Sequence, residues 1–483
     1  MKRTMFALAI LILVVALGLT AWSLAPVQAE PTAMDLEWIG EVTGYRAAME
    51  PLSKDCILDE GYQVYLCEMP RETVAVASDP EVRAQALALA QAGEALFIPD
   101  SAAKVIMVFD STTGDLIDPS FLWLDDEATG TVIQAISGPN GQILVSDQTR
   151  HVVHQYDPNG SYLGVFAPAG GANTAVMESI RGIALRPNGN LLVTVGAGFN
   201  ADAIAEFDTH GNFVGNFVLN GLGGLNSPFD VYQRGDVDWL VSSTDSDNVL
   251  RYALDTGAFV GELASIDRFP QQIREAANGN GNVLVANFSG DQRGIVELTA
   301  AGALVGVSDP EELTSYRGVY ELPNSNLLVS TSTGVHEITR AGTLLETKYQ
   351  GSARFIEPVT LPPLVLRKTV GLNPEVCAAT DRITVEPDTS VTYCYEVMNI
   401  GEVTLSLHDL EDSALGVLLD SYAFDLEPWA STFVTQTVVI TETTVNTATW
   451  TAYNPGPIDQ VEATDTATVN VGYRTLLPLI RRQ

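Results

Sequence analysis

Short apolar runs recur at nearly constant intervals through the middle of the chain, separated by turns that contain Gly, Asn and Asp. The six runs are Leu96-Phe97-Ile98, Ile143-Leu144-Val145, Leu191-Leu192-Val193, Trp239-Leu240-Val241, Val283-Leu284-Val285 and Leu327-Leu328-Val329. Successive runs are 47, 48, 48, 44 and 44 residues apart. Several follow a turn such as Pro187-Asn188-Gly189, and such turns favour tight hairpins. The pattern therefore indicates a repeated structural unit.

Each unit is expected to contain four short strands. The first is an opening strand such as Ile180 to Leu185, and the second is the apolar run. A mixed strand such as His151 to Tyr156 follows, and then an outer strand with a glycine, as in Phe213-Val214-Gly215. Four antiparallel strands per unit of this length are typical of a propeller blade, because one small sheet cannot bury both of its faces alone.

We predict an all-β fold in which residues 82–360 form a six-bladed β-propeller, with six units from Val82 to Gln350. Seven blades remain an alternative. Arg354 to Thr360 has the pattern of an additional opening strand, and residues 36–75 could supply further strands.

The unit resembles those of NHL-type and gluconolactonase-like propellers. The closest match is Leu144-Val145-Ser146-Asp147 with Tyr156-Asp157-Pro158-Asn159-Gly160. In the gluconolactonase-like enzymes, a Glu, an Asn and an Asp from different blades hold a divalent cation at the axis. That resemblance would give Asn287 and Asp230 two of the three roles, but no glutamate occupies the matching position in the first blade. The departure counts against lactonase chemistry.

A second domain is expected at residues 364–474, after a stiff linker at 361–363 that reads Leu-Pro-Pro. Thr and Val alternate there, as in Val391 to Val397, and this period of two indicates half-buried antiparallel strands. About seven such runs predict an immunoglobulin-like β-sandwich. The stretch from Ile383 to Gly401 resembles the conserved repeat domain of bacterial cell-surface proteins, which implies a spacer or adhesive module without catalysis.

The first 29 residues have the pattern of a secretory signal peptide. Lys2 and Arg3 precede an apolar run from Phe6 to Trp22, and cleavage is expected after Ala29. An uncleaved anchor is the alternative. We therefore expect a secreted or cell-surface protein with no stable membrane insertion after cleavage. The tail, 475–483, is apolar and basic, which fits either a sorting signal or a strand at the sandwich edge.

Export makes disulfide bonds plausible for the four cysteines. Cys56 and Cys67 fall in the N-terminal segment, 30–81, where a bond would close a hairpin around Asp59-Glu60-Gly61. Cys377 and Cys394 would tie two neighbouring strands of the second domain. Three pairings are possible, and we favour the local one.

The net charge is −35, from 25 basic and 60 acidic residues, while 46% of residues are hydrophobic. This apolar content predicts folded domains. The charge would repel phosphate backbones and anionic lipids, so nucleic-acid binding is excluded. We expect an extracellular protein, a polysaccharide or a small acidic ligand as partner.

The sequence contains no motif of a known catalytic or metal centre. His151 and His154 are spaced for opposite faces of a strand, so they cannot share a metal. The weak metal candidates are Asp245, Asp247 and Asn287, but the Asp245 loop lacks the spacing of a calcium loop. We therefore predict no cofactor, with Ca²⁺ as the ion that such a site would take.

Residues near the start of the opening strands should face the propeller axis. They are Arg181, Asp230, Gln272, Arg317 and Arg354. Three arginines at equivalent positions could receive a carboxylate or a sugar acid. The sequence alone favours the ordinary alternative, in which each arginine pairs with a rim aspartate such as Asp147, Asp245 or Asp291.

The sequence thus supports three hypotheses. The first is a secreted binding protein, in which the propeller presents a ligand face and the sandwich acts as a spacer. The second is a metal-dependent propeller hydrolase or lyase. The third is a purely structural envelope protein.

Overall fold

The structure is a computed structural model. It describes residues 79–472 except 125–128, 140, 159, 278, 375, 402 and 455–459, together with the backbone of the strands at 56–59 and 64–68. The predicted signal peptide, its cleavage site and the tail at 475–483 lie outside the described residues.

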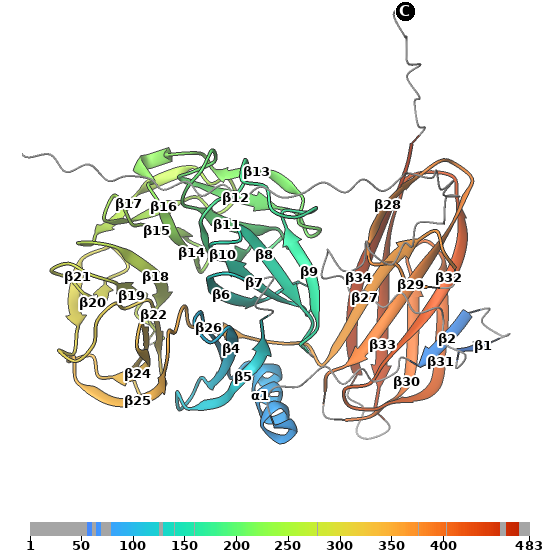
Figure 1. Ribbon diagram of the computed structural model, residues 1–483, viewed down its shortest axis with the longest axis horizontal. Coiled ribbons are helices and arrows are strands. Elements are labelled where there is room, and N and C mark those ends of the chain that lie inside the picture. Colours follow the sequence, from blue (N-terminus) through green and yellow to red (C-terminus); the bar gives the residue numbers. More distant parts are fainter. Residues whose placement is uncertain are drawn as a thin grey trace, which may run out of the picture. The chain divides into compact units, whose positions relative to one another are not determined.

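Six four-stranded antiparallel sheets form the blades of a propeller (Figure 1). Blade 1 comprises β3 (Ala95–Asp100), β4 (Val105–Asp110), β5 (Leu116–Trp123) and β26 (Glu357–Val359). Blade 2 comprises β6 (Val132–Ser137), β7 (Ile143–Asp147), β8 (Val152–Tyr156) and β9 (Tyr162–Ala167). Blade 3 comprises β10 (Ile180–Leu185), β11 (Leu191–Val195), β12 (Ala203–Phe207) and β13 (Phe213–Val218). The 3₁₀ turn η2 (Leu222–Gly224) follows.

The other three blades repeat this order. Blade 4 comprises β14 (Pro228–Arg234), β15 (Asp238–Ser243), β16 (Asn248–Tyr252) and β17 (Phe259–Ser265). Blade 5 comprises β18 (Pro270–Glu275), β19 (Val283–Asn287), β20 (Gly294–Leu298) and β21 (Leu304–Ser308). Blade 6 comprises β22 (Gly318–Glu321), β23 (Leu327–Thr331), β24 (Gly334–Ile338) and β25 (Leu344–Gln350). The six-bladed propeller that the repeat predicted is therefore confirmed.

The ring closes by combining the two ends of the propeller sequence in one blade. The inner strand β26 comes from the end of the propeller and pairs with β3, with Glu357 opposite Phe97. The additional opening strand expected near Arg354 is therefore the missing inner strand of blade 1. Since it completes the sixth sheet, it leaves no strand for a seventh blade. The hairpin within 36–75 also lies in another sheet, described below.

The first unit begins with a helix, which corrects the expected opening strand after Val82. Helix α1 (Pro80–Ala92) starts after Asp79, whose side chain accepts a hydrogen bond from the Glu81 amide. It ends at Gly93, which has a left-handed conformation. An N-cap aspartate, a proline in the first turn and a C-terminal glycine are helix signals that outweigh the repeat pattern. The buried residues Ala86, Leu87 and Ala90 pack with the core of blade 1.

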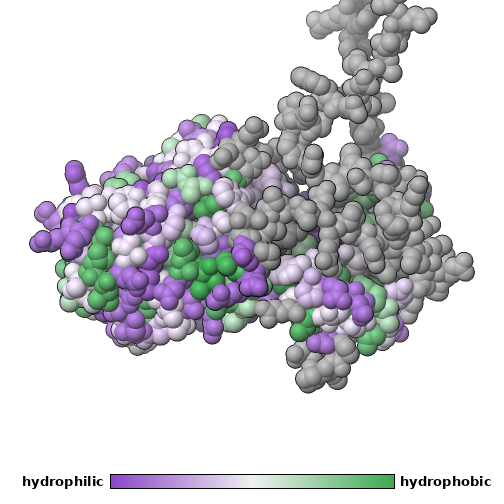
Figure 2. Space-filling model, turned by 60° about the horizontal axis from the view of Figure 1, so that its bottom comes forward, coloured by the Kyte–Doolittle hydropathy of each residue, from purple (hydrophilic) through white to green (hydrophobic). Residues whose placement is uncertain are grey.

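The recurring apolar runs form the second strand of each blade. All five residues of β7, β11, β19 and β23 are buried. The outer strands are more exposed, with apolar side chains in solvent at Phe213, Phe259 and Leu304. Figure 2 shows small hydrophobic patches among hydrophilic residues on the visible face. The buried second strands therefore supply the packing between blades.

The C-terminal domain is a sandwich of two five-stranded sheets. One sheet has the order β1-β2-β32-β29-β27 and the other β28-β34-β33-β30-β31. Its strands are β27 (Leu364–Gly371), β28 (Arg382–Val385), β29 (Thr389–Asn399), β30 (Leu405–Asp412), β31 (Gly416–Leu426), β32 (Ser431–Ile440), β33 (Thr444–Tyr453) and β34 (Gln460–Val471). A core with Tyr393, Tyr395 and Trp450 lies between the sheets.

The predicted N-terminal hairpin is an edge of this sandwich. Strands β1 (Cys56–Asp59) and β2 (Val64–Glu68) pair with Cys56 opposite Cys67, and β2 continues the sheet beside β32. The side chains of Cys56 and Cys67 lie outside the described residues, so their bond stays a prediction.

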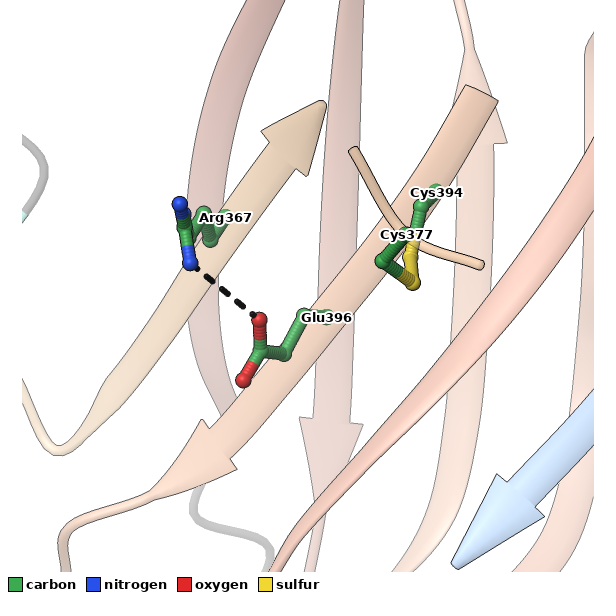
Figure 3. Close-up of a disulfide and its surroundings, with 4 residues drawn as sticks. All are labelled: Arg367, Cys377, Cys394 and Glu396. Carbon is green, nitrogen blue, oxygen red and sulfur yellow. Dashed lines mark ion pairs between the residues drawn. A yellow bond between two sulfur atoms is a disulfide. The ribbon is translucent and has the colours of Figure 1, made fainter. Parts of the chain in front are cut away.

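The second predicted disulfide is present. Cys377 and Cys394 are bonded, with their Cα atoms 5.4 Å apart (Figure 3). Cys377 lies in the connection between β27 and β28, whereas Cys394 lies on β29. The bond therefore ties a loop to a strand, and the expectation of two neighbouring strands is wrong in this detail. Val376, Ala378 and Ala379 flank Cys377, and these small apolar residues do not show where the preceding strand ends.

Candidate functional site

Three arginines occupy equivalent positions where the inner strands begin. Arg181 is the second residue of β10, Arg317 directly precedes β22, and Arg354 lies three residues before β26. All inner strands of a propeller run in the same direction along the axis, so these side chains belong to one end of it. We call this end the arginine end.

Strand register shows that Asp230 and Gln272 are not equivalent to the arginines. Ile183, Val231 and Ile273 pair with the middle of the second strand in their blades. Counting back two residues from each gives Arg181, Phe229 and Gln271. Asp230 and Gln272 lie one residue further along, and alternate residues of a strand face opposite ways. The expectation that they share the arginines' position is therefore off by one residue.

Asp230 and Gln272 join the inner strands of neighbouring blades. The Ile273 amide donates to Oδ2 of Asp230 at 2.8 Å. Oε1 of Gln272 accepts from the Val319 and Ile356 amides, both at 3.0 Å. Gln134, which the sequence did not single out, accepts likewise from Ile183 at 2.7 Å. All three side chains are almost fully buried and tie the blades together, and neither Asp230 nor Gln272 is open to a ligand.

The arginine end is closed by aromatic side chains. Phe229 and Phe355 are buried together with Ile133, and their ring centroids are 5.8 Å apart. Half-buried Phe269 packs against this group, with its ring centroid 5.7 Å from that of Phe229. The guanidinium of Arg181 lies 4.8 Å from the Phe229 ring centroid, a cation–π contact. The axis is therefore plugged by apolar groups, and the arginines lie around the plug.

The three guanidinium groups form no ion pair with a carboxylate among the described residues. The sequence favoured ion pairs with rim aspartates, so that expectation is wrong. Arg181 donates from Nη1 to the Ser227 side chain and to the Pro228 carbonyl. Arg317 donates from Nη1 to Ser352 and Ala353, and Arg354 donates from Nε to Ser101. Each group thus uses one of its three nitrogen atoms for the hydrogen bonds that the described residues supply.

Among the described residues, the rim aspartates form no direct ion pair with these arginines. Asp147 contacts His154 Nε2 at 3.3 Å and accepts from the Arg150 amide at 3.0 Å. Asp245 lies close enough to Arg181 to favour its charge, without a direct ion pair. Burial nevertheless lowers the pKa of Arg181 to about 10, and burial with the nearby charge of Arg317 lowers the pKa of Arg354 to about 10. Both stay cationic at neutral pH but are poorly solvated.

A fourth arginine, which the sequence pattern did not indicate, lies at the same end. Arg268 is exposed in the connection that leads to β18, and it has a φ of 59°. The next residue, Phe269, has a φ of 72°. Two successive non-glycine residues in the left-handed region are strained, and such strain often marks a functional loop. Neither Arg nor Phe favours the left-handed conformation, so the sequence gives no signal for it at Arg268 and Phe269.

The weak metal candidates do not form a cluster. Asn287 is buried, and its Nδ2 donates to the carbonyls of Asp267, Ser289 and Gln292. Asp230 is held instead by Ile273 and lies 3.6 Å from Arg274. Within the described part of the chain, no group of three His, Cys, Asp or Glu side chains is placed to hold a metal ion. Among the histidines, His154 is buried against Asp147 and Tyr162, and His151 accepts from the Ser179 amide.

The opposite end of the axis contains a cavity of about 330 Å³. Its polar lining includes Gln134, Tyr232, Arg274 and Glu357, and we call it the axial cavity. Gln134 donates to Glu357 at 2.7 Å, and Arg274 forms an ion pair with the same carboxylate. Burial raises the pKa of Glu357 to about 6. No sequence pattern indicated this site, because Arg274 and Glu357 are 83 positions apart and meet only when β26 closes the ring.

The fold and the two axial ends define a six-bladed β-propeller joined to a two-sheet β-sandwich. No protein-family model and no curated protein sequence matches the chain. Among the described residues, no helix combines the length and apolar composition needed to cross a membrane.

Solved structures resemble parts of this chain at low identity. One, a protein of unknown function from Bacteroides caccae, is 18% identical, has a TM-score of 0.41, and covers 55% of this chain and 98% of its own. A gluconolactonase from Xanthomonas campestris is 17% identical with a TM-score of 0.39, covering 54% of this chain and 87% of its own. The extracellular domain of a protein described as a one-component system from B. thetaiotaomicron is 11% identical with a TM-score of 0.37, covering 87% of this chain and 62% of its own.

Proposed function

We propose that this is an extracellular binding protein whose propeller receives a carboxylated ligand, such as an acidic polysaccharide, at the arginine end. The observation that carries the proposal is the set of three arginines without carboxylate partners among the described residues. A guanidinium has five N–H donors in a planar fork that matches a carboxylate. Arg181, Arg317 and Arg354 each leave most of these donors uncommitted.

The electrostatics support an anionic ligand. The charge of Arg317 lowers the pKa of Arg354, and both groups are partly removed from water. The Asp100 carboxylate is near enough to favour both charges, but it forms no direct ion pair with either arginine. Two neighbouring cations in a desolvated place repel each other, and an anion between them would relieve the repulsion. The protein as a whole carries a charge of −35, which repels anions. The arginines are a local positive site in this acidic protein, so they favour anionic ligands that approach with a specific geometry.

In this proposal the sandwich is an immunoglobulin-like spacer that sets the propeller apart from the cell surface. The predicted signal peptide and the disulfide between Cys377 and Cys394 both fit an oxidising, extracellular location. Binding alone requires no catalytic group at the arginine end, and none of the described side chains there has the arrangement of a nucleophile with its base.

The test is calorimetric titration with trigalacturonate as a carboxylated probe and maltotriose as its neutral counterpart. We expect the wild-type protein to bind trigalacturonate, and the double variant Arg317→Gln with Arg354→Gln to bind at least about tenfold more weakly. Arg293→Gln is the matched control, because Arg293 already pairs with Asp309 at 2.9 Å. Equal binding by wild type and the double variant would contradict the proposal.

The axial cavity supports a second candidate, an enzyme that uses Glu357 as a general acid or base. A carboxyl group with a pKa of about 6 beside a cavity has the property that such catalysis needs. In that case Glu357→Gln would abolish turnover of an acidic-sugar or lactone substrate, while Arg317→Gln would leave turnover unchanged. If neither variant loses turnover, this candidate is ruled out.

A further inference from the structure

The sandwich buries a lysine at its centre, on the core side of the first strand. Figure 3 shows the opposite side of this sheet, where Arg367 on β27 points toward Glu396 on β29. The next residue, Lys368, is paired in register with Tyr395. Because side chains alternate along a strand, Lys368 points into the core, and it is fully buried there.

Four groups surround the Lys368 ammonium. Its Nζ donates to Oδ2 of Asp412 at 2.8 Å and to the backbone carbonyl of Asn446 at 2.9 Å. The ring centroids of Tyr393 and Tyr395 lie 4.9 and 5.0 Å from the same nitrogen. Burial lowers the pKa of Lys368 to about 8. At neutral pH roughly a tenth of the amine is therefore unprotonated, the form in which nitrogen is a nucleophile.

Asn446 presents a side-chain amide at this place. It lies on β33 and is fully buried. Its Oδ1 accepts a hydrogen bond from Ser413 at 3.2 Å. Its Nδ2 forms no hydrogen bond of ordinary geometry among the described residues, although the amide lies close enough to the Tyr393 hydroxyl to act against the rise of that group's pKa. A buried amide nitrogen that forms no hydrogen bond is rare in native proteins and calls for an explanation. A role as a leaving group is one such explanation.

Asp412 is placed to move protons between these groups. Its Oδ2 accepts from both Lys368 and the Tyr395 hydroxyl, and its Oδ1 accepts from the amides of Ala414 and Leu415. Four hydrogen bonds fix the carboxylate beside the amine. Asp412 is buried with the lysine, so water does not compete for the transfer.

We propose that Lys368 and Asn446 condense into an intramolecular amide bond, with Asp412 as the proton-transfer group. Asp412 takes a proton from the ammonium, and the free Nζ attacks Cγ of Asn446. The Nζ–Cγ bond forms, the Cγ–Nδ2 bond breaks, and the protons lost by Nζ reach Nδ2 through Asp412. The net reaction converts an ammonium and a carboxamide into a secondary amide and an ammonium ion, so it needs no oxidant or other reactant.

This bond would join the two sheets covalently. Lys368 lies on β27 in one sheet and Asn446 on β33 in the other, 78 positions apart. A cross-link between the first and the penultimate strand would prevent the sandwich from being pulled open from its ends. Such a cross-link would stabilise a spacer that is placed under tension. Its formation does not depend on what the propeller binds.

The test is the mass of the full mature chain after reduction of its disulfides. We expect a mass about 17 Da below that of the sequence, the loss of one ammonia. After digestion, the peptide with Lys368 should be linked to the peptide with Asn446. Asn446→Ala and Asp412→Asn should restore the full mass, whereas the control Asn470→Ala, on the neighbouring strand β34, should keep the deficit.

The wild-type measurement decides the matter even if a variant fails to fold. A folded wild-type chain with the full sequence mass, and with separate Lys368 and Asn446 peptides, would overturn the proposal. A deficit of about 18 Da, with a link between Lys368 and Asp412, would overturn the assignment of Asn446 as the acyl partner.

Discussion

At the scale of single residues, the role of a side chain near the propeller axis depends on which of two adjacent positions of the inner strand it occupies. The arginine position lies around the aromatic plug, whereas the next position carries Gln134, Asp230 and Gln272, which bind backbone amides of neighbouring blades. The sequence repeat located both positions to within one residue. It could not separate them, because the register depends on a bulge in the pairing of β10, β14 and β18.

Glu357 gives a prediction about pH at this scale. Its ordinary pKa is 4.5, and burial raises it to about 6, so the folded state favours the protonated carboxyl group. The resulting stability is present below pH 4.5 and is lost as the pH rises through 6. From pH 4.5 to 7 wild type should therefore lose roughly 2 kcal/mol relative to Glu357→Gln. Urea unfolding of both proteins across this range measures the difference, and parallel profiles would contradict the altered pKa.

At the scale of elements, the blades follow from the sequence, but the ends of the propeller do not. The apolar runs predict the second strands because buried strands need uninterrupted apolar residues. Local helix signals replace the first opening strand by α1, and β26 supplies the missing strand from 250 or more residues away in the chain. Periodicity describes neighbours in sequence, so it cannot say which distant strand completes the first sheet.

Close approach of the inner strands gives a second prediction. A Cβ atom on Gly182 would lie 2.8 Å from the Asp230 Cα atom and from the Phe229 carbonyl oxygen, both backbone atoms of the next blade. We expect Gly182→Ala to destabilise the propeller by about 1–3 kcal/mol, since the backbone must move to admit the methyl group. Denaturant unfolding measures this change.

The matched control is Gly306→Ala on the outer strand β21, where a Cβ atom would meet no atom within 4 Å. The control should unfold with wild-type stability. If the two variants are equally stable, the inner strands are less tightly packed than the structure indicates.

At the scale of the whole molecule, the acidic character was evident from the composition, and the domain order was evident from a change in the sequence pattern. A change from Gly-rich turns to Thr/Val alternation near residue 361 marks the transition from propeller to sandwich. The attachment of the hairpin β1–β2 to the sandwich sheet was not evident, although both its strands were expected. Alternation predicts a strand, but pairing between strands hundreds of residues apart leaves no local signal.

The disulfide of the sandwich gives a prediction about stability. Cys377 and Cys394 are separated by 17 positions, and a loop of this size corresponds to about 3 kcal/mol of stabilisation. Replacing both cysteines by serine should lower the unfolding free energy of the sandwich by about this amount and leave the propeller transition unchanged. Calorimetric scans resolve the two transitions, and an unchanged sandwich transition would contradict the prediction.

The most direct test of the binding role is an experimental structure of the protein with trigalacturonate. We expect a carboxylate of the ligand within hydrogen-bond distance of Arg317 or Arg354, next to the aromatic plug formed by Phe229 and Phe355. Electron density for the ligand in the axial cavity, with an empty arginine end, would contradict it.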